Sequence, residues 1–383
     1  MESVAQSPDQ PDNRPHVVRA QVGARSSMTA TVLDTLIELT RLPGPTGQEE
    51  RVLAWCRNRW SQHGAEVSVQ PVGNVLAHIA GDGPKLLIQG HADEIGFLVK
   101  SIDDRGFVWL TTAQAGPQHP HTRYPVGQPA LVLGRNGVLI PGLFATTTGH
   151  ILVTRAEKHT LEANDLFLDL GLESREEAEA LGVYAGASVI WNPPDQRIGK
   201  RYVSKAIDDR VALALVTHLI AEIDHAAIRY DLTIAATVQE EIGLIGATSL
   251  TQRGEYDLAI AIDNGPLGDY PGVDPREMPA KLGYGPMLVY KDGSTHYDRR
   301  IITQLRDVAT ANRIPVQEGV VQGMGTDGAA LIRSGVPSAL LMIATRYTHS
   351  PFEMGDERDL DAALALLKAF VTTPALPLPS GAL

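Results

Sequence analysis

The chain has 383 residues, of which 43% are hydrophobic, and a formal net charge of −12 at pH 7. This length and apolar content allow a large core and suggest two domains. Nucleic-acid binding needs a basic surface, so the acidic balance and the lack of a basic run in the sequence exclude that class of protein. The single cysteine, Cys56, can form no internal disulfide. We therefore expect a reducing, cytoplasmic location and a packing role for Cys56.

The two ends of the chain differ in pattern from the rest. Residues 1–28 are polar and proline-bearing, with no apolar stretch long enough for a signal peptide or a membrane span. We expect a disordered tail there and no membrane partner. Residues 374–383 are expected to form a second flexible tail.

Between these ends, short apolar runs alternate with helical stretches. We interpret five runs as buried strands because they are rich in Leu, Ile, Val, Ala and Thr: KLLIQG, YVSKAI, DLTIAATVQ, DLAIAI and SALLMIATRY. Two stretches that separate them are typical of helices: VALALVTHLIAEI and RRIITQLRDVATAN. The alternation predicts an α/β fold, a mostly parallel sheet flanked by helices, over residues 29–97 and 191–373.

The pattern changes between residues 98 and 190. Short strand-like pieces there are punctuated by glycine and proline: FVWLTT, QPALVLG, GVLIPGLF and ASVIW. Such pieces predict a small β-rich domain, a barrel or a sandwich, inserted into the parallel-sheet domain.

Five side chains with metal-binding capacity lie at the ends of the predicted strands. Ligands of open parallel sheets gather at the carboxyl ends of the strands, so we expect all five at one edge. Each alone is weak evidence, because a lone His-x-Asp is more often a surface loop and paired glutamates are commonly a solvated helix face. Together they make a set of two imidazoles and three carboxylates: His91, Asp208, Glu241, Asp263 and His349.

Such a set is sufficient for two divalent cations if one carboxylate reaches both. Zinc, cobalt and manganese accept mixed nitrogen and oxygen ligands, and we expect zinc ahead of the other two. We assign Asp208 as the bridge. The remaining ligands would then be His91 and Asp263 for one ion and Glu241 and His349 for the other, although spacing along the sequence leaves this pairing open.

Residues beside the ligands supply the remaining chemistry. Asp93 lies two positions after His91, so its side chain can return to the same face and accept the second imidazole N–H. Glu240 precedes Glu241, and adjacent side chains point in different directions. We therefore predict that Glu240 stays free near a water molecule and acts as the general base.

Other polar neighbours leave two interpretations open. Asp209 and Glu94 could support the ligands from outside, but capping of the helix that follows explains Asp209 nearly as well. Lys205 and Arg210 flank Asp208 and could balance its charge, yet ordinary ion pairs are at least as plausible.

For two segments that contain glycine we predict structural roles in preference to catalytic ones. In EEIGLIGATSL, Gly243 and Gly246 would let the backbone turn sharply beside the proposed ligands. In GMGTDGAALIRSG, Thr326 or Asp327 is expected to cap the helix that follows.

Six strings spread along the chain resemble the TET aminopeptidase family, the glutamyl-aminopeptidase-like cocatalytic metallopeptidases: GHADEIGFLVKSIDDRGF, LFLDLGLESREEAEALGV, SKAIDDRVALAL, TVQEEIGLIGA, GMGTDGAAL and RYTHSPFE. The resemblance extends from about Thr29 to about Val371. It implies a zinc-aminopeptidase-like fold and a dinuclear metal aminopeptidase with the five ligands above, Glu240 as base and Asp93 as orienter. It also implies that the insert is a dimerisation domain and that dimers build a hollow tetrahedral dodecamer.

Two segments depart from this resemblance. Relatives tend to carry a Gly-Gly-Trp stretch where this chain has TTAQAGPQHPHTRYPVG, residues 111–127, and Pro-Pro-His where it has ATTTGHI. In the first segment His119 and His121 could contact substrate, although an HPH segment between prolines is more often an exposed loop.

The sequence predicts a hydrolase that releases N-terminal residues from peptides with a metal-activated water molecule. The alternative is a metal-dependent hydrolase or aminohydrolase of a small non-peptide amide or amine, since the altered segment leaves room for a different substrate. Carboxylate pairs also occur in glycoside hydrolases, and the chain could be a non-catalytic scaffold. Retention of every ligand and of Glu240 counts against the scaffold.

Overall fold

The computed structural model describes residues 30–113, 125–147, 165–251, 256–274 and 276–375. By internal contacts the chain divides into Met1–Thr31 and Val32–Leu383, and the second unit contains every element discussed below. The predicted tail at residues 1–28, His119, His121 and most of the predicted C-terminal tail lie outside the described residues. The residue limits of the two predicted domains stay a prediction.

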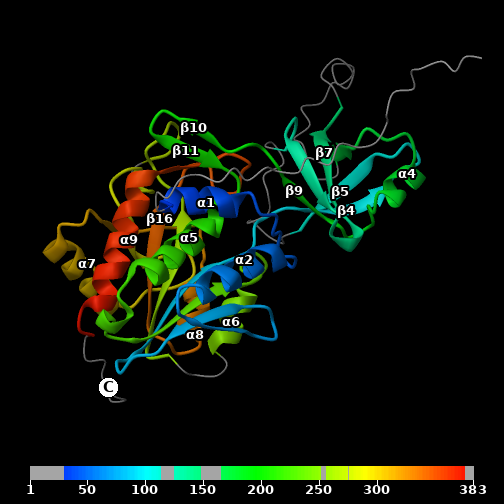
Figure 1. The fold of residues 1–383 in the computed structure, drawn as a ribbon. Helices are drawn as coiled ribbons and strands as arrows, with labels where there is room; N and C mark the ends of the chain where they lie inside the picture. Colours follow the sequence, from blue (N-terminus) through cyan, green and yellow to red (C-terminus); the bar gives the residue numbers. More distant parts are fainter. Residues whose placement is uncertain (1–29, 114–124, 148–164, 252–255, 275, 376–383) are drawn as a thin grey trace, which may run out of the picture. The chain divides into compact units, whose positions relative to one another are not determined.

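The largest element is an eight-stranded mixed sheet (Figure 1). Its central strands β12, β3, β13 and β16 are parallel, whereas β1–β2, β2–β12 and β16–β14 pair antiparallel and β14–β15 pair in parallel. The sheet is thus parallel at its centre, where long β-branched and leucine-rich runs are buried on both faces. Its strands in spatial order are β1 (Glu66–Val69), β2 (Val75–Ile79), β12 (Asp231–Thr237), β3 (Lys85–His91), β13 (Leu258–Gly265), β16 (Ser338–Ala344), β14 (Met287–Lys291) and β15 (Gln317–Val320).

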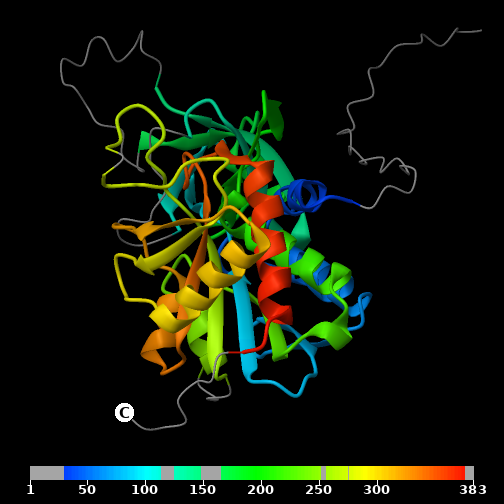
Figure 2. The same cartoon turned by 90° about the vertical axis from the view of Figure 1, so that its left-hand side faces the viewer.

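Helices cover both faces of this sheet, as the alternation of side chains along β3 shows. Leu86 and Ile88 belong to the main core, while Leu87 between them packs in a second cluster with Leu250 and Leu331. Figure 2 shows α9 in red beside α5 in green on the main-core side. That face carries α1 (Val32–Thr40), α2 (Glu50–Ser61), α5 (Ile207–Glu222), α7 (Arg299–Asn312) and α9 (Glu357–Thr372), and the other carries α6 (Ile245–Thr251) and α8 (Asp327–Arg333).

Helix α5 is buried along most of its length, because it lies between the sheet and α1 and α9. Its sequence is apolar all round, which is typical of a helix with no solvent-facing side. Cys56 on α2 is also fully buried, so its predicted packing role is confirmed.

A second sheet corrects one expectation. The run YVSKAI was predicted as a strand of the parallel sheet, but β11 (Arg201–Ser204) pairs antiparallel with β10 (Gln196–Ile198) and β17 (Glu353–Asp356). The run is short and apolar, and periodicity alone does not distinguish the sheet to which such a strand belongs.

The β-rich insert contains a closed six-stranded barrel, with ring contacts among Phe97, Phe144 and Trp191 in its core. Ser174 caps the short helix α4 (Arg175–Ala180) by accepting from the Glu177 backbone N–H. In spatial order the strands are β4 (Phe97–Ile102), β5 (Val108–Thr112), β8 (Phe167–Asp169), β7 (Leu139–Ala145), β6 (Pro129–Leu133) and β9 (Ser188–Trp191), and short 3₁₀ turns occur at Arg135–Gly137 and His225–Ala227. Among the described helices, none has the length and apolar character that a membrane span requires.

Candidate metal centre and active site

The structure brings all five predicted ligands together. Donor atoms of His91, Asp208 and Asp263 lie within 4.8 Å of one another, and so do those of Asp208, Glu241 and His349. Asp208 is common to these two groups, and a third group that meets the same distance joins His91, Glu240 and Glu241. The first two groups correspond to the two ligand sets assigned above, although the roles of the residues stay a prediction.

Four of the five predicted ligands come from the carboxyl ends of central sheet strands. His91 is the last residue of β3 and Asp263 lies near the end of β13, whereas Glu241 and His349 lie in the loops that follow β12 and β16. Parallel strands in register end at the same edge, so segments distant in sequence deliver side chains to one place.

Asp208 departs from the expectation that every ligand follows a strand of the large sheet. It lies after β11 of the small sheet, at the start of α5, where the backbone of Asp208 and Asp209 is not yet helical and their peptide bond is cis. The start of α5 reaches β3 because Gly90 has no side chain. A Cβ on Gly90 would come within 2.2 Å of the Ala212 Cβ and 2.7 Å of Asp209 Oδ2.

The carboxylate of Asp208 lies between the two imidazoles. Its Oδ1 is 3.0 Å from His91 Nε2 and its Oδ2 is 3.3 Å from His349 Nε2. His349 Nε2 is also 3.3 Å from Glu241 Oε1. One oxygen of Asp208 therefore faces each ligand group, which is the arrangement that a bridging carboxylate requires.

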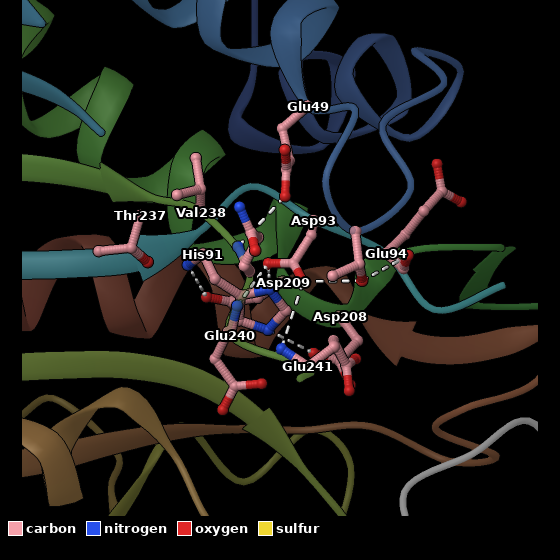
Figure 3. Close-up of polar contacts among 12 residues, drawn as sticks. Glu49, His91, Asp93, Glu94, Asp208, Asp209, Thr237, Val238, Glu240 and Glu241 are labelled. Atoms are coloured by element: carbon pink, nitrogen blue, oxygen red, sulfur yellow. Dashed lines mark hydrogen bonds and ion pairs between the residues drawn. The ribbon is translucent and has the colours of Figure 1, made fainter. Parts of the chain in front are cut away.

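Asp93 connects His91, the first predicted ligand, with the proposed base Glu240 and its neighbour Glu241 (Figure 3). Asp93 Oδ1 lies 3.3 Å from His91 Nδ1 and accepts from the Glu240 backbone N–H at 3.0 Å. Its Oδ2 accepts from the Glu241 backbone N–H at 3.2 Å and from the Thr46 hydroxyl at 2.9 Å. The Glu240 carboxylate points away from Asp93 in Figure 3. Asp93 thus fixes the backbone of two adjacent glutamates, which spacing along the sequence did not reveal.

The structure supports one of the two interpretations of Asp209. Asp209 Oδ2 accepts from the His91 backbone N–H at 3.1 Å, so Asp209 supports a proposed ligand. Among the described residues, no side-chain hydrogen bond caps the start of α5. Burial and the Asp208 charge raise the pKa of Asp209 well above the ordinary value.

Glu94 pairs with the two basic side chains near Asp208, those of Lys205 and Arg210. Lys205 Nζ lies 3.0 and 2.7 Å from its two carboxylate oxygens, and Arg210 Nη2 lies 3.6 Å away. The Gly44 backbone N–H donates to the same carboxylate at 3.1 Å. Ordinary ion pairing is thus what the structure shows for Lys205 and Arg210, and the pairs tie the segment after His91 to the start of α5.

Asp327, a carboxylate near the site, does not cap the helix that follows it, although its capping role was one of the two expected. Thr326, and not Asp327, caps α8 by accepting from the Gly328 N–H at 3.2 Å. Asp327 Oδ2 instead accepts from the Thr237 hydroxyl at 2.6 Å. Burial raises the pKa of Asp327 to about 6.

The sharp turn predicted beside the proposed ligands is present at Gly243. Its φ is +126°, a conformation that favours glycine.

The site carries an excess of buried acidic groups. Burial first, and then neighbouring carboxylates, raise the pKa of Glu240, Glu241 and Asp263. Burial also raises the carboxyl pKa of Asp208, but the paired imidazoles of His349 and His91 outweigh it and lower the net pKa. The surrounding carboxylates overcome burial and raise the pKa of both imidazoles. Divalent cations relieve the repulsion between these carboxylates. The donor set therefore fits the pair of divalent metal ions that the five residues predict.

The proposed ligands line one side of a cavity of about 440 Å³. Glu240 lies in its wall beside the proposed ligands, and the rest of the wall mixes glycines with apolar and polar side chains. Arg333, at the end of α8, is the sole Lys or Arg among the described residues of the wall. The lining residues used below are Glu240, Glu241, Asp263, Met324, Arg333 and His349.

Buried carboxylates and imidazoles at the edge of a sheet, facing one cavity, place the protein among metal-dependent hydrolases of the α/β type. A family model for M42 glutamyl aminopeptidase matches residues 73–366. The chain belongs to the M42 glutamyl aminopeptidase family, and it is a metallo-aminopeptidase, a hydrolase of peptide bonds. The resemblance drawn from the six sequence strings is confirmed.

Known proteins agree with this assignment over most of the chain. Lysyl aminopeptidase of Pyrococcus furiosus is 30% identical over 312 residues, which are 80% of this chain and 86% of that protein. The structure of aminopeptidase APDkam598 from Desulfurococcus kamchatkensis aligns with a TM-score of 0.83 at 31% identity, covering 89% and 94% of the two chains. TET1 peptidase of Pyrococcus horikoshii, which assembles into a tetrahedron or a large octahedral shell, aligns with a TM-score of 0.80 at 27% identity, covering 89% and 99%.

Proposed function

We propose that the protein is a dinuclear metal aminopeptidase that removes N-terminal residues from peptides. The observation that carries this proposal is the position of Asp208, whose two oxygens face His91 and His349 separately. His91 and Asp263 would hold one ion with Asp208, and Glu241 and His349 would hold the other. Two divalent ions, zinc ahead of cobalt or manganese, would lower the pKa of a water molecule and polarise the scissile carbonyl.

The chain's own residues then handle the proton and the geometry. Glu240 lies in the cavity wall with its carboxylate free of Asp93, so it can take a proton from a water molecule at its oxygen. The same carboxyl group then protonates the leaving amine. Asp93 holds the Glu240 backbone through its N–H at 3.0 Å and keeps the base in place.

The acidic wall of the cavity supports exopeptidase specificity. A free α-amine carries positive charge and would lie at the acidic, metal-lined end of the cavity. Only the first residue of a peptide presents such an amine, so cleavage would release single N-terminal residues. The names of the relatives, lysyl aminopeptidase among them, support a peptide substrate.

The alternative substrate class is a small non-peptide amide. The altered segment at residues 111–127 motivated it, and residues 114–124 of that segment lie outside the described part of the chain. The described wall of the cavity, which includes Met324 and Arg333, is compatible with a peptide side chain.

We further propose that residues 98–190 form a dimerisation domain and that the protein is a homo-oligomer in the cytoplasm. Exposed apolar side chains on and beside β7, namely Val138, Leu139 and Leu143, support a contact between copies at this barrel. The shell-forming TET1 peptidase supports a large assembly built from such dimers. Light scattering of the purified protein measures the size of the assembly.

A substrate panel with controlled metal content tests the activity. We expect hydrolysis of aminoacyl anilides and short peptides with a free amine, no hydrolysis of N-acetylated versions, and loss of activity in chelator. Because Arg333 lies in the cavity wall, the panel includes acidic, basic and apolar first residues. Turnover of N-blocked amides at the rate of free-amine peptides would favour the alternative substrate class.

A further inference from the structure

Glu353 joins two of the proposed ligand segments through their backbones. It is the first residue of β17 and is 2% exposed. Its Oε2 accepts from the Asp208 backbone N–H at 3.0 Å, and its Oε1 accepts from the His349 backbone N–H at 3.0 Å. One side chain thus holds the residue assigned as the bridge and a terminal ligand of the second group. Neither contact was anticipated, although Glu353 lies within the string RYTHSPFE.

The two segments that Glu353 holds are irregular. His349 has φ of +60°, which is uncommon for a residue with a side chain, and Asp208 has φ of −73° and ψ of 105° within the first turn of α5. Asp208 is extended where the helix would otherwise begin, whereas the conformation of His349 is sparsely populated and persists only where surrounding contacts fix it. Glu353 supplies such contacts, because each of its carboxylate oxygens accepts a hydrogen bond from one of the two backbone N–H groups.

The small sheet explains why Glu353 reaches both segments. Strand β17 pairs antiparallel with β11, and Glu353 lies opposite Ser204, the last residue of β11. The chain leaves β11 at Ser204 and reaches Asp208 four residues later. His349 precedes Glu353 by four residues on the other side. A side chain at this position therefore lies where the two segments converge.

We propose that Glu353 is a positioning residue for the metal centre, setting Asp208 and His349 in the orientation in which they bind divalent ions. This inference rests on the proposed dinuclear site. A carboxylate suits the task because both of its oxygens accept hydrogen bonds, whereas an amide has one accepting oxygen and an NH₂ group that would face the second N–H. Groups that orient metal ligands from outside affect metal affinity by about 10–100-fold.

The test compares two buried carboxylates with the same hydrogen-bonding pattern. Asp359 accepts from the backbone N–H groups of Gly283 and Gly285, both at 2.7 Å, and is fully buried. It makes no contact with the proposed ligands among the interactions of the described residues. Glu353→Gln and Asp359→Asn are therefore matched changes, one at the metal centre and one outside it.

The readout is metal binding. Metal-free wild type and both variants are titrated with Co²⁺, followed by visible absorption, and dialysed samples are analysed for bound metal. For Glu353→Gln we expect a dissociation constant about 10–100-fold higher at the group of Asp208, Glu241 and His349, with a changed Co²⁺ spectrum. For Asp359→Asn we expect a lower melting temperature but wild-type stoichiometry and spectrum.

Further outcomes decide the inference. Wild-type affinity and spectrum in folded Glu353→Gln, or equal loss of metal in Asp359→Asn, would overturn the role of Glu353 while leaving the dinuclear site intact. A wild type that binds fewer than two ions would overturn both the proposed function and this inference. If Glu353→Gln does not fold, Glu353→Asp is used, which keeps the charge but is too short to reach both N–H groups. It is judged by the same affinity and spectrum.

Discussion

Glu240 and Glu241 are adjacent in sequence but differ in what their side chains contact. Glu241 Oε1 lies 3.3 Å from His349 Nε2, whereas the Glu240 carboxylate lines the cavity without an ion pair among the interactions of the described residues. Both backbone N–H groups donate to Asp93. A single residue step therefore separates a proposed ligand from a proposed base.

This difference gives a matched pair of substitutions. Glu240→Gln removes the proton acceptor but no ligand, so we expect kcat to fall by about 10²–10⁴-fold with full metal content. Glu241→Gln weakens a ligand, so we expect both metal content and activity to fall. Metal analysis beside steady-state kinetics distinguishes them. Wild-type turnover by Glu240→Gln would contradict its role as the base.

Glu49 predicts a pH dependence of stability. Its carboxylate accepts from the Gly47 N–H at 2.8 Å and the Gln239 N–H at 3.2 Å. Burial, and then the charge of Asp93, raise its pKa from 4.5 to about 7. The folded state therefore binds more protons than the unfolded state between these pH values, and the free energy of unfolding decreases as pH rises through this window.

Glu49→Gln removes that penalty and keeps an accepting oxygen. In metal-free protein we expect no gain in stability near pH 4 and a gain that reaches a plateau above pH 7, at most about 3 kcal/mol. Denaturant unfolding of both proteins from pH 4 to 8 measures it. Glu50→Gln, which changes an exposed carboxylate one residue further on, is the control. A gain that is equal at all pH values would contradict the explanation.

At the scale of elements, helix α8 depends on a single cap. The Thr326 hydroxyl accepts from the Gly328 N–H at 3.2 Å and lies 2.9 Å from the Tyr297 hydroxyl. We expect Thr326→Ala to lower the free energy of unfolding by about 1–2 kcal/mol, since a cap and a buried hydrogen bond are lost together. Thr326→Ser keeps the hydroxyl and should restore most of the stability in the same thermal melt. Equal losses in both variants would show that the methyl group matters more than the cap.

Elements with strong local patterns were predictable from the sequence. The run RRIITQLRDVATAN corresponds to α7, and the buried runs that end near His91 and Asp263 are central parallel strands. The small sheet was not predictable, because the pairing of β11 with β17 joins residues about 150 positions apart through backbone hydrogen bonds, which leave no mark in a local pattern.

The site divides in the same way. The residues at strand ends that can bind metal could be found from the sequence, because the residue type alone indicates this capacity. Thr46 and Glu353 could not, since they act by accepting from or donating to groups that only the folded chain brings near. Asp327 shows the same limit, because its partner Thr237 lies on another strand.

At the scale of the whole molecule, the metal centre links distant parts of the chain, so its ions should stabilise the fold. Saturating divalent metal at 100 times the dissociation constant adds about 2.7 kcal/mol per site. We therefore expect the melting temperature to be higher with zinc or cobalt than with chelator. His349→Ala should shrink this difference, and a wild type that melts at the same temperature in both conditions would contradict tight binding.

The barrel lies in the chain between His91 on β3 and Asp208 at the start of α5. A ribosome that has made the protein only through the barrel has released a single imidazole donor of the centre, and the other donors follow with α5, β12, β13 and β16. All five proposed ligands are therefore available only after β16 and the loop that follows it have been synthesised, so we expect a newly made chain to bind its two ions after nearly the whole sequence has been translated.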